Sequence, residues 1–361
     1  MSEQETVSKP GSDLYSRDGK AVDNWYVLCL SDELNNKPIN RMIYDNHFAL
    51  FRDEENKPVC ILDRCLHRHT HLSMGGWVKD GKLSCPYHGW EYDKNGQVTH
   101  IPSEGPNSEV TRKLCLKTLP CVEQDGAIWV WTGEEKPKTE LPPWRFPNHG
   151  KEGWNHYFMK TEFTGEAINL CENFMDVPHT VYVHAGWFRD QKFQKVPMTV
   201  ETKDGKVKVT YLQEEDSFSW GANLLLNPGG NKMIHTDTYI YPNLTCVEYW
   251  FGENGFVINS QITPVSSLKS VVYTYIAYKV RFFGSILKPI IGYYTRQVIN
   301  QDVDIMVNQG SSLGWDPKTT FRSTPADEVH ICIERLRHFG EKGEEEKLKS
   351  FTSKKDVEFW I

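Results

Sequence analysis

The chain has 361 residues, a net charge of −7, and 39% hydrophobic and 25% charged residues, which is the composition of a globular protein with room for two domains. The acidic balance argues against nucleic-acid binding, which needs a basic face. No apolar run is long enough to span a membrane, because the nearest one, 282–294, is short and contains Lys288.

Residues 1–22 are expected to form a flexible N-terminal tail, because they are polar and lack the apolar core of a signal peptide. The nine cysteines show no disulfide-scaffold spacing, which indicates a reducing compartment, and we expect a cytoplasmic protein. Residues 23–135 alternate short β-rich runs with Asn-Gly and Asp-Gly turns, which predicts a small all-β domain. A proline-rich linker, 136–150, is expected to follow.

Residues 151–345 mix strands and helices. An entering strand at 155–160 precedes a helical segment, 167–184, and a second helix is predicted at 286–308. Between them lie β-rich runs separated by Gly, Asn and Pro, at 199–211, 218–226, 234–241, 246–251, 256–263 and 271–280. This order predicts an α+β fold with one antiparallel sheet flanked by helices. Residues 346–361 are expected to form a charged C-terminal tail.

The first chemical motif consists of two short segments, Cys65-Leu66-His67-Arg68 and Cys85-Pro86-Tyr87-His88-Gly89-Trp90, with 17 residues between His67 and Cys85. Two thiolates and two imidazoles are a full ligand set for a small metal centre, and zinc is the first competitor. Zinc fingers, however, group cysteine with cysteine and histidine with histidine. Alternating Cys and His in each segment suits two irons, one held by cysteines and the other by histidines, as in a Rieske [2Fe–2S] cluster.

These segments resemble the signature of the Rieske-type non-haem iron oxygenases, the ring-hydroxylating oxygenase family. The run Cys-Pro-Tyr-His-Gly-Trp is the family's usual one, whereas His69 stands where the family normally has glycine after Cys-x-His-Arg. The resemblance implies that the first domain is a Rieske domain. Its [2Fe–2S] ligands would be Cys65, His67, Cys85 and His88.

A second motif lies in the predicted helix, where Asp176, His179 and His184 occur within nine residues. A non-haem Fe(II) site needs two histidines and one carboxylate. Asp176 and His179 are three apart and would share a helix face, but His179 and His184 are five apart and would not. We therefore expect a distortion or a helix end near Pro178.

This run is similar to the same family's Asp-x-x-His-x4-His motif, which is usually introduced by Glu-Asn. The resemblance implies that His179 and His184 bind the mononuclear iron and that Asn173 lies near it. It also implies that Asp176 is a catalytic bridging carboxylate, which links His179 to the Rieske ligand His88 across a subunit boundary.

The third iron ligand has to lie downstream, where Asp302 and Asp304 are the candidates. At 100° per residue, Asp302 shares a face with Val298, Ile299, Ile305 and Met306, whereas Asp304 lies among Asn300, Gln301 and Asn308. A carboxylate on an apolar face is costly unless a cation meets it, which favours Asp302. The family pattern, with an aliphatic residue three positions on and Gln seven positions on, also selects Asp302.

The chain has no Gly-x-Gly-x-x-Gly after a strand, so NAD(P)H is expected to act only indirectly. The resemblance implies a separate reductase, with or without a ferredoxin, as the electron donor. It also implies a catalytic domain of the helix-grip type and a head-to-tail homotrimer, because one chain's cluster is too far from its own iron.

We therefore predict the terminal oxygenase component of a Rieske oxygenase system, with O₂ as co-substrate, that hydroxylates or demethylates a small organic molecule as a monooxygenase. Two alternatives remain open: a cis-dihydroxylating dioxygenase α subunit, and a Rieske electron-transfer or ligand-binding protein with a lapsed iron site. Pocket walls are expected from the helix after Asn173 and from 187–188, 224–226 and 249–251.

Overall fold

The computed structural model describes residues 20–106, 109–137, 139–142, 144–187, 194–212, 227, 229–280, 284–316 and 320–361. The chain divides into two compact units between Arg145 and Phe146, inside the segment expected as a linker. Most of the expected N-terminal tail and the expected strand 218–226 lie outside the described residues.

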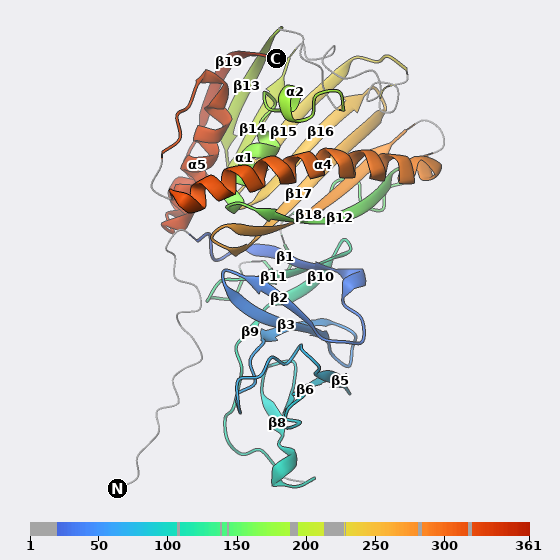
Figure 1. Cartoon of the computed structure of the whole chain (residues 1–361), viewed down its shortest axis with the longest axis vertical. Helices are drawn as coiled ribbons and strands as arrows, with labels where there is room; N and C mark the ends of the chain where they lie inside the picture. The colour runs from blue at the N-terminus through green and yellow to red at the C-terminus, as the bar shows by residue number, and fades with distance from the viewer. Residues whose placement is uncertain are drawn as a thin grey trace. The chain divides into compact units, whose positions relative to one another are not determined.

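The first unit is built from three small antiparallel sheets (Figure 1). Their orders are β1-β11-β10, β2-β3-β4-β9 and β5-β6-β7-β8. The strands are β1 (Trp25–Leu30), β2 (Ile39–Ile43), β3 (Asn46–Arg52), β4 (Pro58–Leu62), β5 (Trp77–Lys79), β6 (Lys82–Ser84), β7 (Glu91–Tyr92), β8 (Val98–His100), β9 (Thr118–Leu119), β10 (Cys121–Gln124) and β11 (Ala127–Trp131). The connections β4–β5 and β6–β7 carry the two Cys/His segments.

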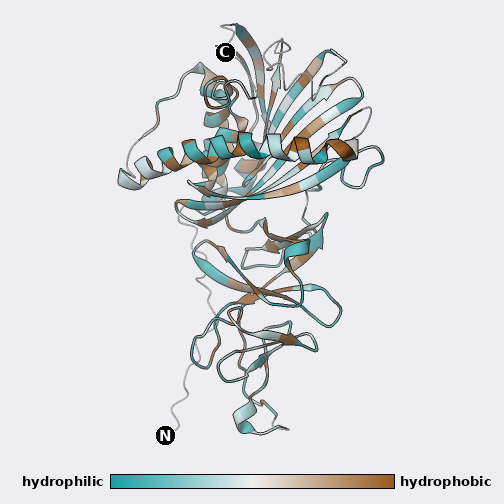
Figure 2. Cartoon of the chain, turned by 45° about the vertical axis from the view of Figure 1, so that its right-hand side comes forward, coloured by the Kyte–Doolittle hydropathy of each residue, from teal (hydrophilic) through white to brown (hydrophobic). Residues whose placement is uncertain are grey.

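The second unit contains one eight-stranded antiparallel sheet in the order β12-β18-β17-β16-β15-β14-β13-β19. Its strands are β12 (Asn155–Thr164), β13 (Lys195–Lys203), β14 (Lys206–Tyr211), β15 (Met233–Ile240), β16 (Leu244–Phe251), β17 (Asn254–Ser266), β18 (Lys269–Lys279) and β19 (Ser353–Trp360). Buried and more exposed residues alternate along β13, β14 and β15, whereas β17 and β18 are buried along most of their length. Figure 2 shows the hydropathy of each residue as the colour of the ribbon.

Helices pack on this sheet, and α1, α4 and α5 lie on the same side of it (Figure 1). The helices are α1 (Ala167–Met175), α2 (Thr180–Val183), α4 (Gly284–Trp315), α5 (Glu328–Glu341) and α6 (Glu345–Ser350). Helix α5 was not predicted, although Val329, Cys332, Ile333 and Leu336 recur at helical spacing and are buried. Helices α1, α2 and α4 lie over one face of the sheet. Side chains from these helices therefore meet side chains from that face.

The prediction of a charged C-terminal tail at 346–361 was wrong. Helix α6 and strand β19 occupy this segment, and β19 pairs along its length with β13. Val357, Phe359 and Ile361 alternate toward the core, and Phe359 and Ile361 are buried. Glu358 between them and the preceding Lys354, Lys355 and Asp356 are exposed, so the edge strand looks like a solvated tail by composition alone.

Candidate active site

In the first unit, the two Cys/His loops bring four potential ligands together. Cys65 and Cys85 are both buried, each 1% exposed. The rings of His67 and His88 lie next to each other, with centroids 4.4 Å apart. His67 Nδ1 is buried and has no hydrogen-bond partner among the described residues, as expected of a nitrogen whose lone pair is reserved for a metal.

The two loops share one backbone conformation. In each loop the cysteine carbonyl accepts a hydrogen bond from the amide four residues on, His69 at 2.9 Å from Cys65 and Gly89 at 3.0 Å from Cys85. Both amide-bearing residues have positive φ, 58° at His69 and 73° at Gly89. His69 thus occupies the left-handed position that glycine occupies in the second loop, at a cost of about 1 kcal/mol.

Tyr92 supports the first loop and was missed by the sequence analysis. Its hydroxyl accepts a hydrogen bond from the Leu66 amide at 2.9 Å and lies 3.2 Å from Cys65 Sγ. Burial and the neighbouring Cys65 raise the pKa of Tyr92 well above its ordinary value, so the hydroxyl keeps its proton and donates it toward the sulfur. Trp90 stacks on His67 with an interplanar angle of 5°.

In the second unit, the helical segment around Pro178 is interrupted. Helix α1 ends at Met175, Asp176 is extended, and α2 begins at Thr180, so that His179 and His184 flank the single turn of α2. This break lets histidines five residues apart face each other, with their Nε2 atoms 3.3 Å apart. The expected helix end near Pro178 is therefore present.

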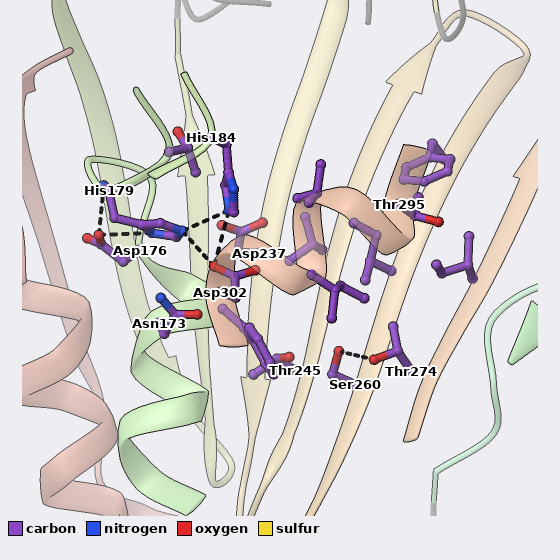
Figure 3. Close-up of a pocket in the computed structure, with 18 of the residues that line it drawn as sticks. Asn173, Asp176, His179, His184, Asp237, Thr245, Ser260, Thr274, Thr295 and Asp302 are labelled. Atoms are coloured by element: carbon purple, nitrogen blue, oxygen red, sulfur yellow. Dashed lines mark hydrogen bonds and ion pairs between the residues drawn. The ribbon is translucent and has the colours of Figure 1, made fainter. Parts of the chain in front are cut away.

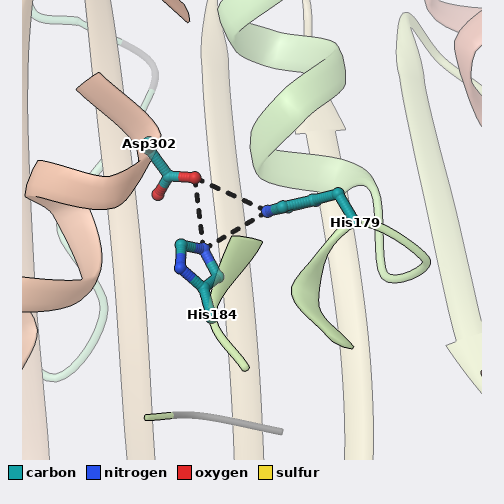
Figure 4. Close-up of side chains that lie close together, drawn as sticks. All are labelled: His179, His184 and Asp302. Atoms are coloured by element: carbon teal, nitrogen blue, oxygen red, sulfur yellow. Dashed lines mark hydrogen bonds and ion pairs between the residues drawn. The ribbon is translucent and has the colours of Figure 1, made fainter. Parts of the chain in front are cut away.

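The structure brings Asp302 of α4 to these histidines (Figure 4). Its Oδ1 lies 3.2 Å from His184 Nε2 and 3.5 Å from His179 Nε2. One ligand atom from each of the three residues lies within 4.8 Å of the others. Asp302 is buried whereas Asp304 is exposed, although Ile305, expected on the inward face, is 41% exposed.

The Nδ1 atom of each of these two histidines contacts a side chain outside the ligand group. His179 Nδ1 lies 3.2 Å from Asp176 Oδ2, which also accepts the His179 backbone amide at 2.9 Å. His184 Nδ1 lies 2.9 Å from Gln301 Oε1. Such outer contacts fix the tautomer and aim Nε2 at the centre. Gln301 was assigned to the wet face of α4 from sequence, and no sequence signal marked this contact.

The charges of this group are strongly coupled. Burial lowers the pKa of His179, but hydrogen bonds to Asp176 and Asp302 outweigh it and raise the pKa to about 9. Burial raises the pKa of Asp302, but the two histidines outweigh it and hold the pKa below its ordinary value. The donor set, two imidazoles and a carboxylate around one point, fits a divalent iron ion.

The three residues open into a cavity of about 120 Å³ between the helices and the sheet (Figure 3). Its walls are mainly apolar, and they include Phe174 and Tyr249, from two of the segments expected to form them. Asn173 also lines it, and its Oδ1 is buried without a hydrogen-bond partner among the described residues. Of the other expected wall residues, Phe188 and 224–226 lie outside the described residues.

Comparison with known families matches both units separately. Residues 24–122 match the family described as Rieske [2Fe-2S] domain, and residues 165–338 match the family described as vanillate O-demethylase oxygenase C-terminal domain. The two units thus carry the two domains of the Rieske oxygenases. The predicted α+β fold, an all-β Rieske domain followed by a catalytic domain with an antiparallel sheet and helices, is confirmed. The predicted cofactors, a [2Fe–2S] cluster and a mononuclear iron, are those of this Rieske oxygenase family.

Individual relatives match this chain in part. The oxygenase component of dicamba O-demethylase from Stenotrophomonas maltophilia is 31% identical over 229 residues, 63% of this chain and 62% of the relative. Chlorophyllide a oxygenase from Chlamydomonas reinhardtii is 36% identical over 146 residues, 40% of this chain and 22% of the relative. These alignments span less than two thirds of each relative's length.

The solved structure of NdmA from Pseudomonas putida CBB5 with caffeine superimposes with a TM-score of 0.76. It is 22% identical in sequence and covers 92% of this chain and 96% of the other. This likeness concerns the fold. In the part of the chain that the structure describes, no helix is long and apolar enough to cross a membrane.

Proposed function

We propose that this chain is the terminal oxygenase component of a Rieske oxygenase system, a monooxygenase that hydroxylates or demethylates a small organic substrate with O₂. The observation that carries the proposal is the cluster of His179, His184 and Asp302 at the end of a largely apolar cavity, in a chain that also has a Rieske domain. A pure electron carrier has no use for such a cavity. Demethylating relatives favour monooxygenation over cis-dihydroxylation.

The proposed ligands of the [2Fe–2S] cluster are Cys65, His67, Cys85 and His88, and those of the iron are His179, His184 and Asp302. When bound, the cluster supplies electrons singly and the iron supplies the centre for O₂-dependent oxidation. The ligand residues contribute the lone pairs that would bind the metals. Asp176 and Gln301 hold the Nδ1 protons of His179 and His184, which leaves both Nε2 atoms to face Asp302.

Asp176 is the proposed bridge between subunits. Its Oδ2 is engaged by His179, whereas its Oδ1 lies 3.8 Å from His330 Nε2. Asp176 also lines a second cavity of about 480 Å³, through which an imidazole from outside the chain could reach this carboxylate. In the proposed head-to-tail homotrimer, that imidazole is His88 of the partner subunit, and Asp176 links it to His179.

The electron donor in this proposal is a separate reductase, with or without a ferredoxin, and NAD(P)H reaches the chain only through it. Asn173 is proposed to lie beside the bound iron, since its side-chain oxygen lines the same cavity. The proposal includes a cytoplasmic location, supported by an iron–sulfur cluster and by cysteines that form no disulfide.

The first test is the iron and acid-labile sulfide content of protein purified without oxygen. We expect roughly three irons and two sulfides per chain, one cluster plus one mononuclear iron. About two irons per chain, with no uptake of added Fe(II), would indicate that the mononuclear site does not bind iron. Zinc without sulfide would refute the cluster and the function together.

A further inference from the structure

One buried carboxylate in the cavity has no part in the proposed iron chemistry. Asp237 projects from β15 into the same cavity as His179, His184 and Asp302 (Figure 3) and is only 2% exposed. In the sheet its cross-strand neighbours are Val209 and Val247, which offer no hydrogen bond. A carboxylate placed between valines needs donors from elsewhere.

One side chain supplies a hydrogen bond to it. His235, two residues before Asp237 on the same face of β15, donates from Nε2 to Asp237 Oδ1 at 2.8 Å. The His235 ring is sandwiched between Tyr211 and Tyr249, with centroid distances of 4.4 and 4.2 Å and interplanar angles of 19° and 22°. This stacking fixes the imidazole, and through it the orientation of the Asp237 carboxylate.

Tyr211 supports Asp237 indirectly, through its stacking on His235. Its hydroxyl donates to the Met175 carbonyl at 3.4 Å, and burial and the charge of Asp237 raise the pKa of Tyr211 well above its ordinary value. A carboxylate accepts about four hydrogen bonds, and His235 provides one of them, which leaves acceptor positions on a carboxylate that lines the cavity. A carboxylate with a purely structural role would be expected to have these acceptor positions filled by protein donors.

Besides the three proposed iron ligands, the cavity wall carries the carboxylates of Asp176 and Asp237, and none of the described residues that line it is Lys or Arg. Other polar groups of the described wall include neutral hydroxyls such as those of Thr245 and Ser260. The three carboxylates of Asp176, Asp237 and Asp302 outnumber the two charges of a divalent iron ion. A substrate carboxylate would therefore approach like charge, and it would meet no Lys or Arg among the described wall residues.

We propose that Asp237 accepts a hydrogen bond from an N–H or O–H group of the substrate, so that this site takes neutral or cationic compounds and discriminates against carboxylates. This inference rests on the proposed function, because it assigns the substrate class of the same site. The cavity of about 120 Å³ is similar in size to a cavity of roughly 150 Å³ that holds benzene, which favours a substrate with a single ring.

The test uses three probes with the same ring and methyl ether: 4-methoxybenzoate, 4-methoxybenzamide and 4-methoxybenzylamine. Dissociation constants are measured by calorimetry on the reduced, iron-loaded enzyme without oxygen. We expect the amide and the amine to bind at least about tenfold more tightly than the carboxylate. Equal or tighter binding of the carboxylate, or no binding of the amide and amine, would overturn the proposal.

The variant Asp237→Asn removes the charge at nearly constant volume. It should weaken amine binding by about tenfold or more and improve carboxylate binding, whereas Asp304→Asn, which changes an exposed carboxylate on α4, should leave the order unchanged. An unchanged order in Asp237→Asn would contradict the assignment. If Asp237→Asn does not fold, the wild-type panel still decides.

Iron content, measured on the same samples, separates the two hypotheses. Enzyme that holds its mononuclear iron but prefers the carboxylate refutes only the role of Asp237. Enzyme without that iron refutes the proposed function.

Discussion

The two candidate metal sites of this protein are assembled in different ways. In the first unit all four potential ligands come from two loops between Cys65 and His88, and each loop is closed by its own backbone hydrogen bonds. In the second unit the site needs a residue from α4, and the outer contact to His184 comes from Gln301, 117 residues further along the chain. The first site therefore depends on local turn geometry, and the second depends on the packing of α4 over α2 and the sheet.

This difference predicts that the second site is the easier one to lose without unfolding the protein. Local loops keep their conformation if their own hydrogen bonds survive. A site spread over several elements fails when any one element shifts or loses its ligand.

The largest effect is expected for Asp302→Asn. The amide cannot replace the buried charge that faces His179 and His184, so the mononuclear iron should fall from about one per chain to near zero and turnover should be lost. The two irons and two sulfides of the cluster should remain. Metal analysis and the visible spectrum check this, with Asp304→Asn as the exposed control, and retention of the mononuclear iron would remove Asp302 from the ligand set.

Asp176→Asn should separate metal binding from turnover. The amide oxygen can still accept the His179 amide, so both metals should stay bound. Substrate-dependent turnover should fall by about 100-fold or more, because the proposed link to His88 of the partner subunit is weakened. Rapid-mixing measurement of cluster oxidation tests this, and normal turnover would exclude the bridge.

Glu172→Gln addresses the stability of the second unit. Burial, followed by the charges of Glu334 and Asp327, raises the pKa of Glu172 to about 8. Because the folded pKa is raised, Glu172 costs no stability below about pH 4.3, its unfolded value, and the penalty grows until the pH passes about 8.

The variant should therefore be more stable than wild type by about 1–3 kcal/mol at pH 8.5 and nearly equal to it at pH 5. Thermal unfolding at the two pH values measures this. An equal gain at both values would show that the Glu172 pKa is not raised.

Tyr92→Phe should change the first site without dismantling it. The variant loses a donor to Cys65 Sγ, and a hydrogen bond of about 1 kcal/mol corresponds to a potential roughly 40 mV more negative for one electron. Redox titration of the cluster gives the shift. An unchanged potential would mean that the hydroxyl does not donate to the sulfur.

The smallest effect is expected for His69→Gly. Glycine takes the positive φ of this position without strain but adds entropy to the unfolded chain, so the net gain should be at most about 1 kcal/mol. Denaturant unfolding measures it. Alanine at this position serves as the control, since it keeps the strain, and a clear loss in the glycine variant would assign the His69 side chain a contact of its own.

Much of the candidate site could be predicted from its motifs, because the types of ligand residue and their spacing are properties of the sequence. The two Cys/His segments, the break near Pro178 and the choice of Asp302 over Asp304 could all be argued from neighbouring residues. The same reasoning failed at Ile305, because a single helical wheel assumes that every turn of α4 meets the same partner. It also failed at the C-terminus, where composition hid the alternation of Val357, Phe359 and Ile361.

The sequence by itself determined the domain order, the metal-ligand candidates and the antiparallel character of the second unit, because these follow from spacing and periodicity. Only the tertiary structure decided which distant groups meet. Gln301 behind His184, Tyr92 beside Cys65 and Asp237 in the cavity carry no local signal, since each depends on which strands and helices become neighbours. Hydrogen bonds reach only about 3 Å, so these contacts exist only after packing has placed both partners.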